Sequence, residues 1–160
     1  MALDEIRKLG DPVLLEKAEE VFPDELPALM PEIEKMWRLI SEFRQVYGRG
    51  RAIAAPQIGL LKRIICLDTD RRHALVNPVL MADGDEMMEL WDDCMSFPNL
   101  LVRLKRFRRV TITFRDTEWN EKVWKLSDDM SELIQHEYDH LDGILAISRA
   151  ENISCFRWTD

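Results

Sequence analysis

Residues 135–140 read QHEYDH and contain an H-E-x-x-H motif. On a helix, residues four positions apart lie on the same face, so His136 and His140 could bind one metal ion together. Glu137 would then lie beside the ion, where a carboxylate can take a proton from a metal-bound water. The motif therefore indicates metal-assisted hydrolysis, although the same residues could also form a solvated helix face.

Cys94 is the candidate for a third metal ligand. It stands in the segment WDDCMSFP, residues 91–98, after a predicted strand and before a turn bounded by proline. A buried free cysteine usually serves only as a small apolar side chain of the core. This is the alternative role for Cys94, and it is the role that we expect for Cys66 and Cys155. A Cys-His-His set would leave a fourth coordination position open for water, as a catalytic metal site requires.

A third segment, GRAIAAPQIG at residues 50–59, combines small side chains with one amide. It could simply be a loop that leaves a helix. Small side chains also allow the backbone to approach a ligand closely, and Gln57 offers an amide donor that could stabilise an oxyanion.

Helices and strands of an α+β domain are expected to position these segments. Apolar residues recur at helical spacing over about residues 27–46. A second helix is predicted over 129–141, with Asp129 as N-cap, Glu132 closing a capping box and Gly143 ending the helix. Strands are predicted at 63–68, 74–79, 86–91, 110–115 and 122–126, the last two as a hairpin. Residues 1–24 are expected to be irregular, and the tail after residue 147 is left unassigned.

Length and composition narrow the class of protein. A chain of 160 residues fits a single domain, residues 1–160, with a sizeable core. The formal net charge of −8 argues against a nucleic-acid partner. Three cysteines and the lack of a signal segment or a membrane-spanning run favour the cytoplasm and no association with a membrane.

In this order the three segments resemble the motifs of the peptide deformylase family. The family patterns are G-φ-G-φ-A-A-P-Q, E-G-C-φ-S and Q-H-E-x-D-H, where φ is apolar; here they read GRAIAAPQ, DDCMS and QHEYDH. The resemblance covers most of the chain. It implies a peptide deformylase-like α+β fold, with mixed or antiparallel sheets packed around a central H-E-x-x-H helix and with an N-terminal helix.

The resemblance also implies a reaction, the removal of the formyl group from N-formylmethionyl peptides of nascent proteins with release of formate. Glu137 would be the general base, and the Gln57 side chain and the backbone N–H of Met95 would hold the oxyanion. Gln135 and Asp139 would support the ligands. The metal would be divalent, with ferrous iron usual and zinc, nickel or cobalt able to replace it, and its ligands would be Cys94, His136 and His140.

The chain departs from the family pattern near the expected substrate, where the binding residues would be Gly50, Arg51, Ala52 and Asp92. Arg51 replaces an apolar residue, Ala52 replaces a glycine, and Asp92-Asp93 replaces Glu-Gly. We expect Asp93 to adopt a backbone conformation usually left to glycine. The changes could be drift, with Arg51 and Asp93 pointing to water or pairing with each other.

Three functions remain open from the sequence. The first is peptide deformylation, the second is hydrolysis of another N-formyl substrate, and the third is a homologue of low activity that keeps its metal for structure or binding. Docking on the ribosome through a long C-terminal helix is doubtful, because only about a dozen residues follow Ile147.

Overall fold

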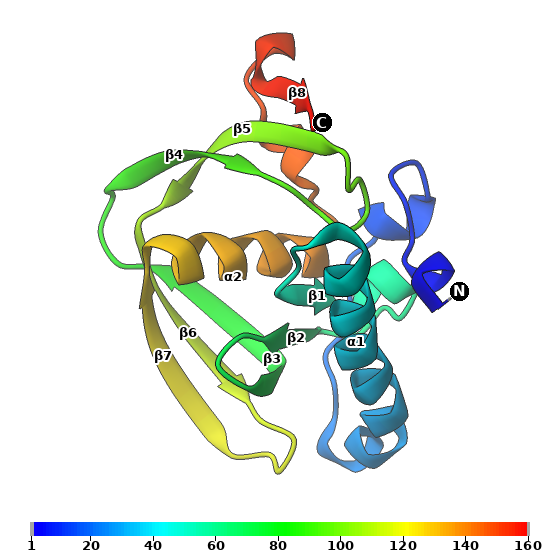
Figure 1. Ribbon diagram of the computed structural model, residues 1–160. Coiled ribbons are helices and arrows are strands. Elements are labelled where there is room, and N and C mark those ends of the chain that lie inside the picture. The colour runs from blue at the N-terminus through cyan, green and yellow to red at the C-terminus, as the bar shows by residue number, and fades with distance from the viewer. Residues whose placement is uncertain (1, 160) are drawn as a thin grey trace.

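The computed structural model describes residues 2–159. The H-E-x-x-H segment lies in helix α2 (Asp128–Leu141), which runs through the middle of the molecule between two sheets (Figure 1). Helix α1 (Leu26–Tyr47) packs outside the larger sheet. The predicted α+β architecture, with sheets around a central helix and an N-terminal helix, is confirmed.

All strand pairs between named strands are antiparallel, and the strands form two sheets with the orders β1-β2-β3-β6-β7 and β4-β5-β8. The five-stranded sheet consists of β1 (Ala52–Ala54), β2 (Ile64–Asp68), β3 (Arg72–Ala82), β6 (Arg109–Arg115) and β7 (Glu121–Ser127). The three-stranded sheet consists of β4 (Met87–Asp92), β5 (Leu100–Phe107) and β8 (Phe156–Trp158). The predicted hairpin is confirmed as β6 and β7.

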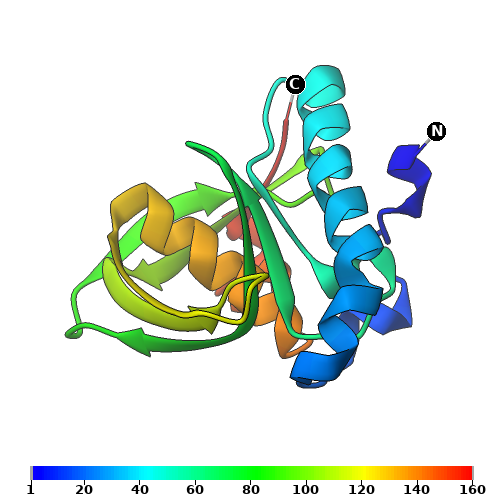
Figure 2. The same ribbon diagram turned by 90° about the horizontal axis from the view of Figure 1, so that it is seen from below.

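Strand β2 is apolar from Ile64 to Leu67 because both of its faces are buried there. Ile64 and Cys66 point into the core shared with α1, whereas Ile65 and Leu67 point into the core shared with α2. Figure 2 shows the two helices on opposite faces of this sheet. This sandwich fixes α2, and with it the two histidines, against β1 and the segment that follows it.

Short 3-10 turns provide the remaining regular structure. The described N-terminal residues before α1 contain no long helix or strand, as expected, and form three short turns at Ala2–Glu5, Pro12–Leu15 and Pro23–Glu25. Three more lie at Ala55–Ile58, Ala146–Arg149 and Ile153–Cys155. Within residues 2–159, neither α-helix combines the length and apolar character needed to cross a bilayer.

The predicted start of the second helix is wrong. Ser127 is the N-cap, Asp129 lies inside the first turn, and no side chain caps the helix. The cause is the preceding strand, which continues to Ser127. The backbone N–H of Asp128 is then held by the carbonyl of Arg108 at 2.9 Å, with Asp128 at φ 54°. Glu132 is therefore free of a capping role.

Strands β5 and β8 were not predicted. In β5 the inward positions are Val102, Leu104 and Arg106, and the buried arginine breaks the apolar alternation that marks a strand. Strand β8 has only three residues and forms by pairing with Leu100, Leu101 and Val102 of β5. Its pairing partner lies far away in sequence, so local sequence patterns do not reveal it.

Gly143, directly after α2, is expected to tolerate no side chain. Its φ is 72°, and an added Cβ would lie 2.5 Å from the carbonyl oxygen of Leu15. Gly143→Ala should therefore lower the free energy of unfolding by about 2–3 kcal/mol, measured by urea denaturation. Gly48 has the same φ of 72°, but a Cβ added there would have no neighbouring atom within 4 Å. Gly48→Ala should therefore lower the free energy of unfolding by only about 1 kcal/mol. Equal losses would contradict the backbone contact.

Candidate metal centre

Three buried side chains from two segments meet at the middle of the molecule. His136 and His140 lie one turn apart on α2, and Cys94 lies in the turn after β4. Their ligand atoms all lie within 4.8 Å of one another. The Sγ of Cys94 is 3.4 Å from the Nε2 of His140. Tetrahedral coordination with ordinary Zn–S and Zn–N bond lengths would place the two atoms roughly 3.5 Å apart. The donor set therefore fits one divalent metal ion.

His136 is oriented by a carboxylate behind it. Its Nδ1 is 2.9 Å from Asp92 Oδ2, which leaves Nε2 facing the site. Burial lowers the pKa of His136, but the Asp92 and Cys94 charges outweigh burial and raise it. Burial and the neighbouring His136 lower the pKa of His140, so this side chain is neutral. A carboxylate behind a ligating histidine is the usual support of a protein metal site.

Glu137 carries an unpaired carboxyl atom inside this site. Its Oε1 is buried and has no hydrogen-bond partner among the described residues, and the same is true of the Nδ1 of His140. Burial is the main cause that raises the pKa of Glu137 to about 7. A carboxyl group with a pKa near neutrality can both accept and return a proton, as a general base requires.

Gln57 points its amide N–H toward the sulfur of Cys94. Its Oε1 accepts a hydrogen bond from the backbone N–H of Ala54 at 2.9 Å, which fixes the orientation of the amide. Its Nε2 donates to Cys94 Sγ at 3.4 Å and to Ser96 Oγ at 3.1 Å. The donor predicted from the sequence therefore lies beside the three ligand side chains.

A buried charge network that the sequence did not reveal supports the site. Arg106 on β5 donates to Asp92 Oδ2 at 3.0 Å and to Asp139 Oδ2 at 2.7 Å. Its side chain is only 2% exposed. The carboxylate of Asp139 also accepts two hydrogen bonds from Arg149, at 2.6 and 2.8 Å. Arg106 thus joins the carboxylate behind His136 to α2 itself. Its inward position in β5 is the one sequence signal that could have identified it.

Gln135 attaches α2 to the end of β5. Its Oε1 accepts from the backbone N–H of Phe107 at 3.0 Å, and its Nε2 donates to the carbonyl of Phe107 at 2.8 Å. The same Nε2 also reaches Ser131. Gln135 and Asp139 therefore hold the helix in place, and neither belongs to the group of three metal-ligand side chains.

A cavity of about 160 Å³ opens beside these groups. It is lined by Gln57, Cys94, His136 and Glu137 and also by the residues that depart from the family pattern: Arg51, Ala52, Asp92 and Asp93. Gly50 and Met95 also line it. A Cβ on Gly50, at φ 131°, would lie 3.0 Å from the Phe43 ring and 3.1 Å from Met95 Cε. The backbone at Gly50 is therefore packed closely against two side chains of the chain itself, and the close approach of this segment to a substrate stays a prediction.

Two ion pairs cross this cavity lining. Arg51 Nη2 lies 3.4 Å from Glu132 Oε2, and Arg49 Nε lies 2.7 Å from Asp93 Oδ2. Arg49 also donates to the carbonyl of Pro98. The idea that Arg51 and Asp93 pair with each other is wrong, because each has another partner. Asp93 is also not among the residues of positive φ, so the expected strain there is absent.

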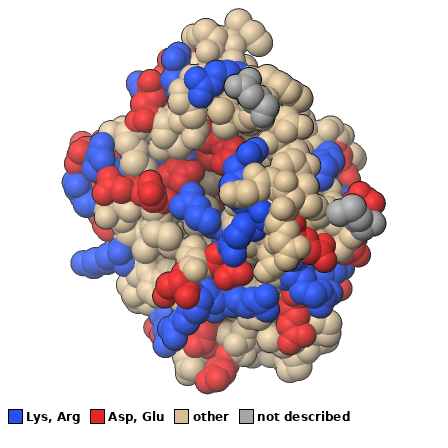
Figure 3. Space-filling model, in the orientation of Figure 1, with Lys and Arg blue, Asp and Glu red and all other residues tan. Residues whose placement is uncertain are grey.

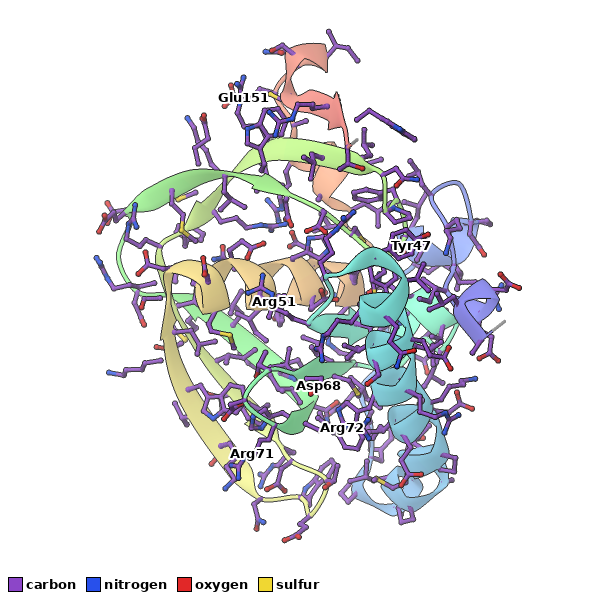
Figure 4. All side chains as sticks on the ribbon, in the orientation of Figure 1. Tyr47, Arg51, Asp68, Arg71, Arg72 and Glu151 are labelled. Carbon is purple, nitrogen blue, oxygen red and sulfur yellow. The ribbon has the colours of Figure 1, made fainter. Side chains whose placement is uncertain are left out.

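Glu132 lines the cavity, whereas the sequence pattern predicted only a helix-capping role for it. It follows the first turn of α2, and its side chain is only 14% exposed. Burial and the nearby Asp92 raise the pKa of Glu132 to about 7. Figure 4 shows Arg51 extending over α2, which is where Glu132 lies. In Figure 3, acidic and basic side chains are mixed across this face.

The fold and the site together define a candidate metal centre of the hydrolytic type: a Cys-His-His group that could hold an ion lies beside a cavity that Cys94 and His136 line together with the buried Glu137 carboxyl group and the Gln57 amide. Two further cysteines lie outside this group: Cys66 is buried in the core and has a pKa raised by burial, and Cys155 is buried beside β8.

The model of the polypeptide deformylase family matches residues 3–155. The chain is 39% identical to a peptide deformylase of Heliobacterium modesticaldum over 156 residues, covering 95% of this chain and 97% of the relative. The crystal structure of peptide deformylase from Thermotoga maritima has a TM-score of 0.83 and 31% identity, over 92% of this chain and 97% of the other. A Synechococcus elongatus peptide deformylase in complex with actinonin has a TM-score of 0.84 and 27% identity, over 93% and 79%. The chain belongs to the polypeptide deformylase family.

Proposed function

We propose that this protein is a metal-dependent peptide deformylase. It hydrolyses the formamide bond of N-formylmethionyl peptides of nascent proteins and releases formate and a free amino terminus. The observation that carries this proposal is the buried group of Cys94, His136 and His140, of which Cys94 and His136 line one cavity with Glu137 and Gln57. Relatives named peptide deformylase, which match almost the whole chain, support the same reaction.

Cys94, His136 and His140 would hold one divalent ion, for which we propose ferrous iron. The same nitrogen and sulfur donors also suit zinc, nickel and cobalt. When bound, the ion supplies a Lewis acid and lowers the pKa of water in the site. Asp92 keeps the Nδ1 of His136 occupied at 2.9 Å, so that Nε2 is the available ligand atom.

Glu137 would handle the proton of the reaction. Its carboxylate accepts a proton from the attacking water while the water oxygen bonds to the formyl carbon. The same carboxyl group then returns the proton to the peptide nitrogen as the C–N bond breaks. Gln57 Nε2 and the backbone N–H of Met95 would donate to the carbonyl oxygen as negative charge develops there. The peptide would lie along Gly50, Arg51 and Ala52, which border the same cavity.

The cytoplasm is the compartment that we propose, because nascent formylated chains are the substrate. The three cysteines are all free, which suits a reducing compartment.

Formate release tests the proposed function directly. The protein, purified without oxygen and loaded with ferrous iron, should release formate from a formyl-Met tripeptide. Metal removal by a chelator should abolish the release, and added ferrous iron should restore it. A protein with one bound metal per chain and no formate release from any formyl peptide would instead be the metal-binding homologue of low activity.

A further inference from the structure

An arginine and a glutamate side chain stand in the cavity where the reaction would occur. Arg51 and Glu132 line the same cavity as Glu137 and Gln57. They are only loosely paired, with 3.4 Å between Nη2 and Oε2. Arg51 is 44% exposed at the mouth, whereas Glu132 is 14% exposed and lies deeper. The lining therefore presents a carboxyl group within and a guanidinium group nearer to solvent.

The substrate side chain next to the formyl group must enter this space. The formyl carbon has to reach Glu137 and Gln57, and the Cα of the first residue is only two bonds farther along the chain. The cavity holds about 160 Å³, which leaves room for one short side chain beside the formyl group. What the lining offers to this side chain then decides which formyl peptides react fastest.

An apolar side chain would make Arg51 and Glu132 lose water without giving either a new partner. Burying a charged group costs free energy unless hydrogen bonds replace its water, and the 3.4 Å contact is a weak replacement. A cationic side chain could pair with Glu132 but would also lie beside Arg51, and an anionic side chain could pair with Arg51 but would also lie beside Glu132 and Asp93. A carboxamide satisfies both members of the pair, because its N–H can donate to Glu132 and its carbonyl can accept from Arg51.

We propose that Arg51 and Glu132 determine the side-chain preference of this enzyme, and that formyl peptides whose first side chain is a carboxamide are turned over more efficiently than formyl-methionyl peptides. The inference rests on the proposed deformylase function and specifies its substrate class. Methionyl peptides remain substrates, with a lower kcat/KM.

The first test compares four tripeptides that differ only in the first residue: formyl-Gln, formyl-Met, formyl-Lys and formyl-Glu. Glutamine and methionine have side chains of similar length, so the comparison isolates the amide. We expect kcat/KM for formyl-Gln to exceed that for formyl-Met by about tenfold, the effect of one well-made hydrogen bond to a charged group. The lysine and glutamate peptides should both react more slowly than the glutamine peptide.

Variants assign the preference to the pair. Arg51→Met combined with Glu132→Leu should make formyl-Met the better substrate. Arg51→Met alone changes only a partly exposed side chain at the mouth, so this variant serves if the double variant folds poorly. It should reduce the preference for the glutamine peptide. The matched control is Lys105→Met with Glu151→Leu, an exposed ion pair of 3.8 Å on another face, which should leave the ratio unchanged.

A binding measurement separates recognition from chemistry. Titration of metal-loaded Glu137→Ala with formyl-Gln and formyl-Met peptides should give tighter binding of the glutamine peptide. Equal or better turnover of formyl-Met by the unmodified enzyme would overturn the inference while leaving the deformylase function intact. Fastest turnover of the lysine or the glutamate peptide would overturn it as well. The absence of formate from all four peptides would overturn the proposed function itself.

Discussion

Glu137→Ala should lower kcat for formate release by about 10²–10⁴-fold, the range that general acid–base catalysis contributes. The buried Oε1 of Glu137 has no partner among the described residues, and the side chain lines the cavity with Cys94 and His136, two of the three proposed ligand residues. Its removal takes away the group that accepts and returns the proton. The side chain is not one of the three candidate ligands, so the variant should still bind one metal per chain.

The comparison needs both formate release and metal content, measured on the same iron-loaded preparations. Glu151→Ala is a suitable control because Glu151 is exposed and does not line the cavity. It should retain the activity of the unmodified protein. A Glu137→Ala variant that binds its metal and still releases formate at more than a tenth of the normal rate would remove Glu137 from the mechanism.

Arg106→Met should lower the free energy of unfolding by about 3–5 kcal/mol, the usual cost of removing one partner from a buried ion pair. Arg106 contacts Asp92 at 3.0 Å and Asp139 at 2.7 Å, and its own side chain is 2% exposed. Of their ion-pair partners, Asp92, which is buried to the same extent, would keep His136, and Asp139 would keep Arg149. Urea denaturation of the metal-loaded protein measures the loss.

Arg108→Met provides the contrast, because Arg108 is 36% exposed and forms pairs with Glu86 and Asp128 that are open to solvent. Its replacement should cost less than about 1 kcal/mol, as is usual for surface ion pairs. Arg106→Met should also weaken metal binding by about 10–100-fold, since Asp92 orients a ligand histidine. If the two arginine variants were equally stable, the buried network would not be a structural support of the site.

Local patterns in the sequence contained much of the candidate site. Helical spacing identified α2, and the H-E-x-x-H motif on it identified His136, His140 and Glu137. Cys94 could be named because it stands between a strand and a proline-bounded turn, and Gln57 because it ends a run of small residues. Alternating apolar residues also predicted the hairpin of β6 and β7. These features depend on neighbours a few positions away, which is why the sequence alone is sufficient for them.

Only the tertiary structure decided how the site is supported and what lines it. Arg106 looked like an interruption of a strand, yet it is buried because Asp92 and Asp139 approach it from β4 and α2. Glu132 looked like a helix cap, yet the strand that continues to Ser127 moves the start of the helix and leaves Glu132 facing Arg51. These roles come from charges brought together across distant segments. A buried charge is stable only where folding supplies its partner, and no local pattern specifies that partner.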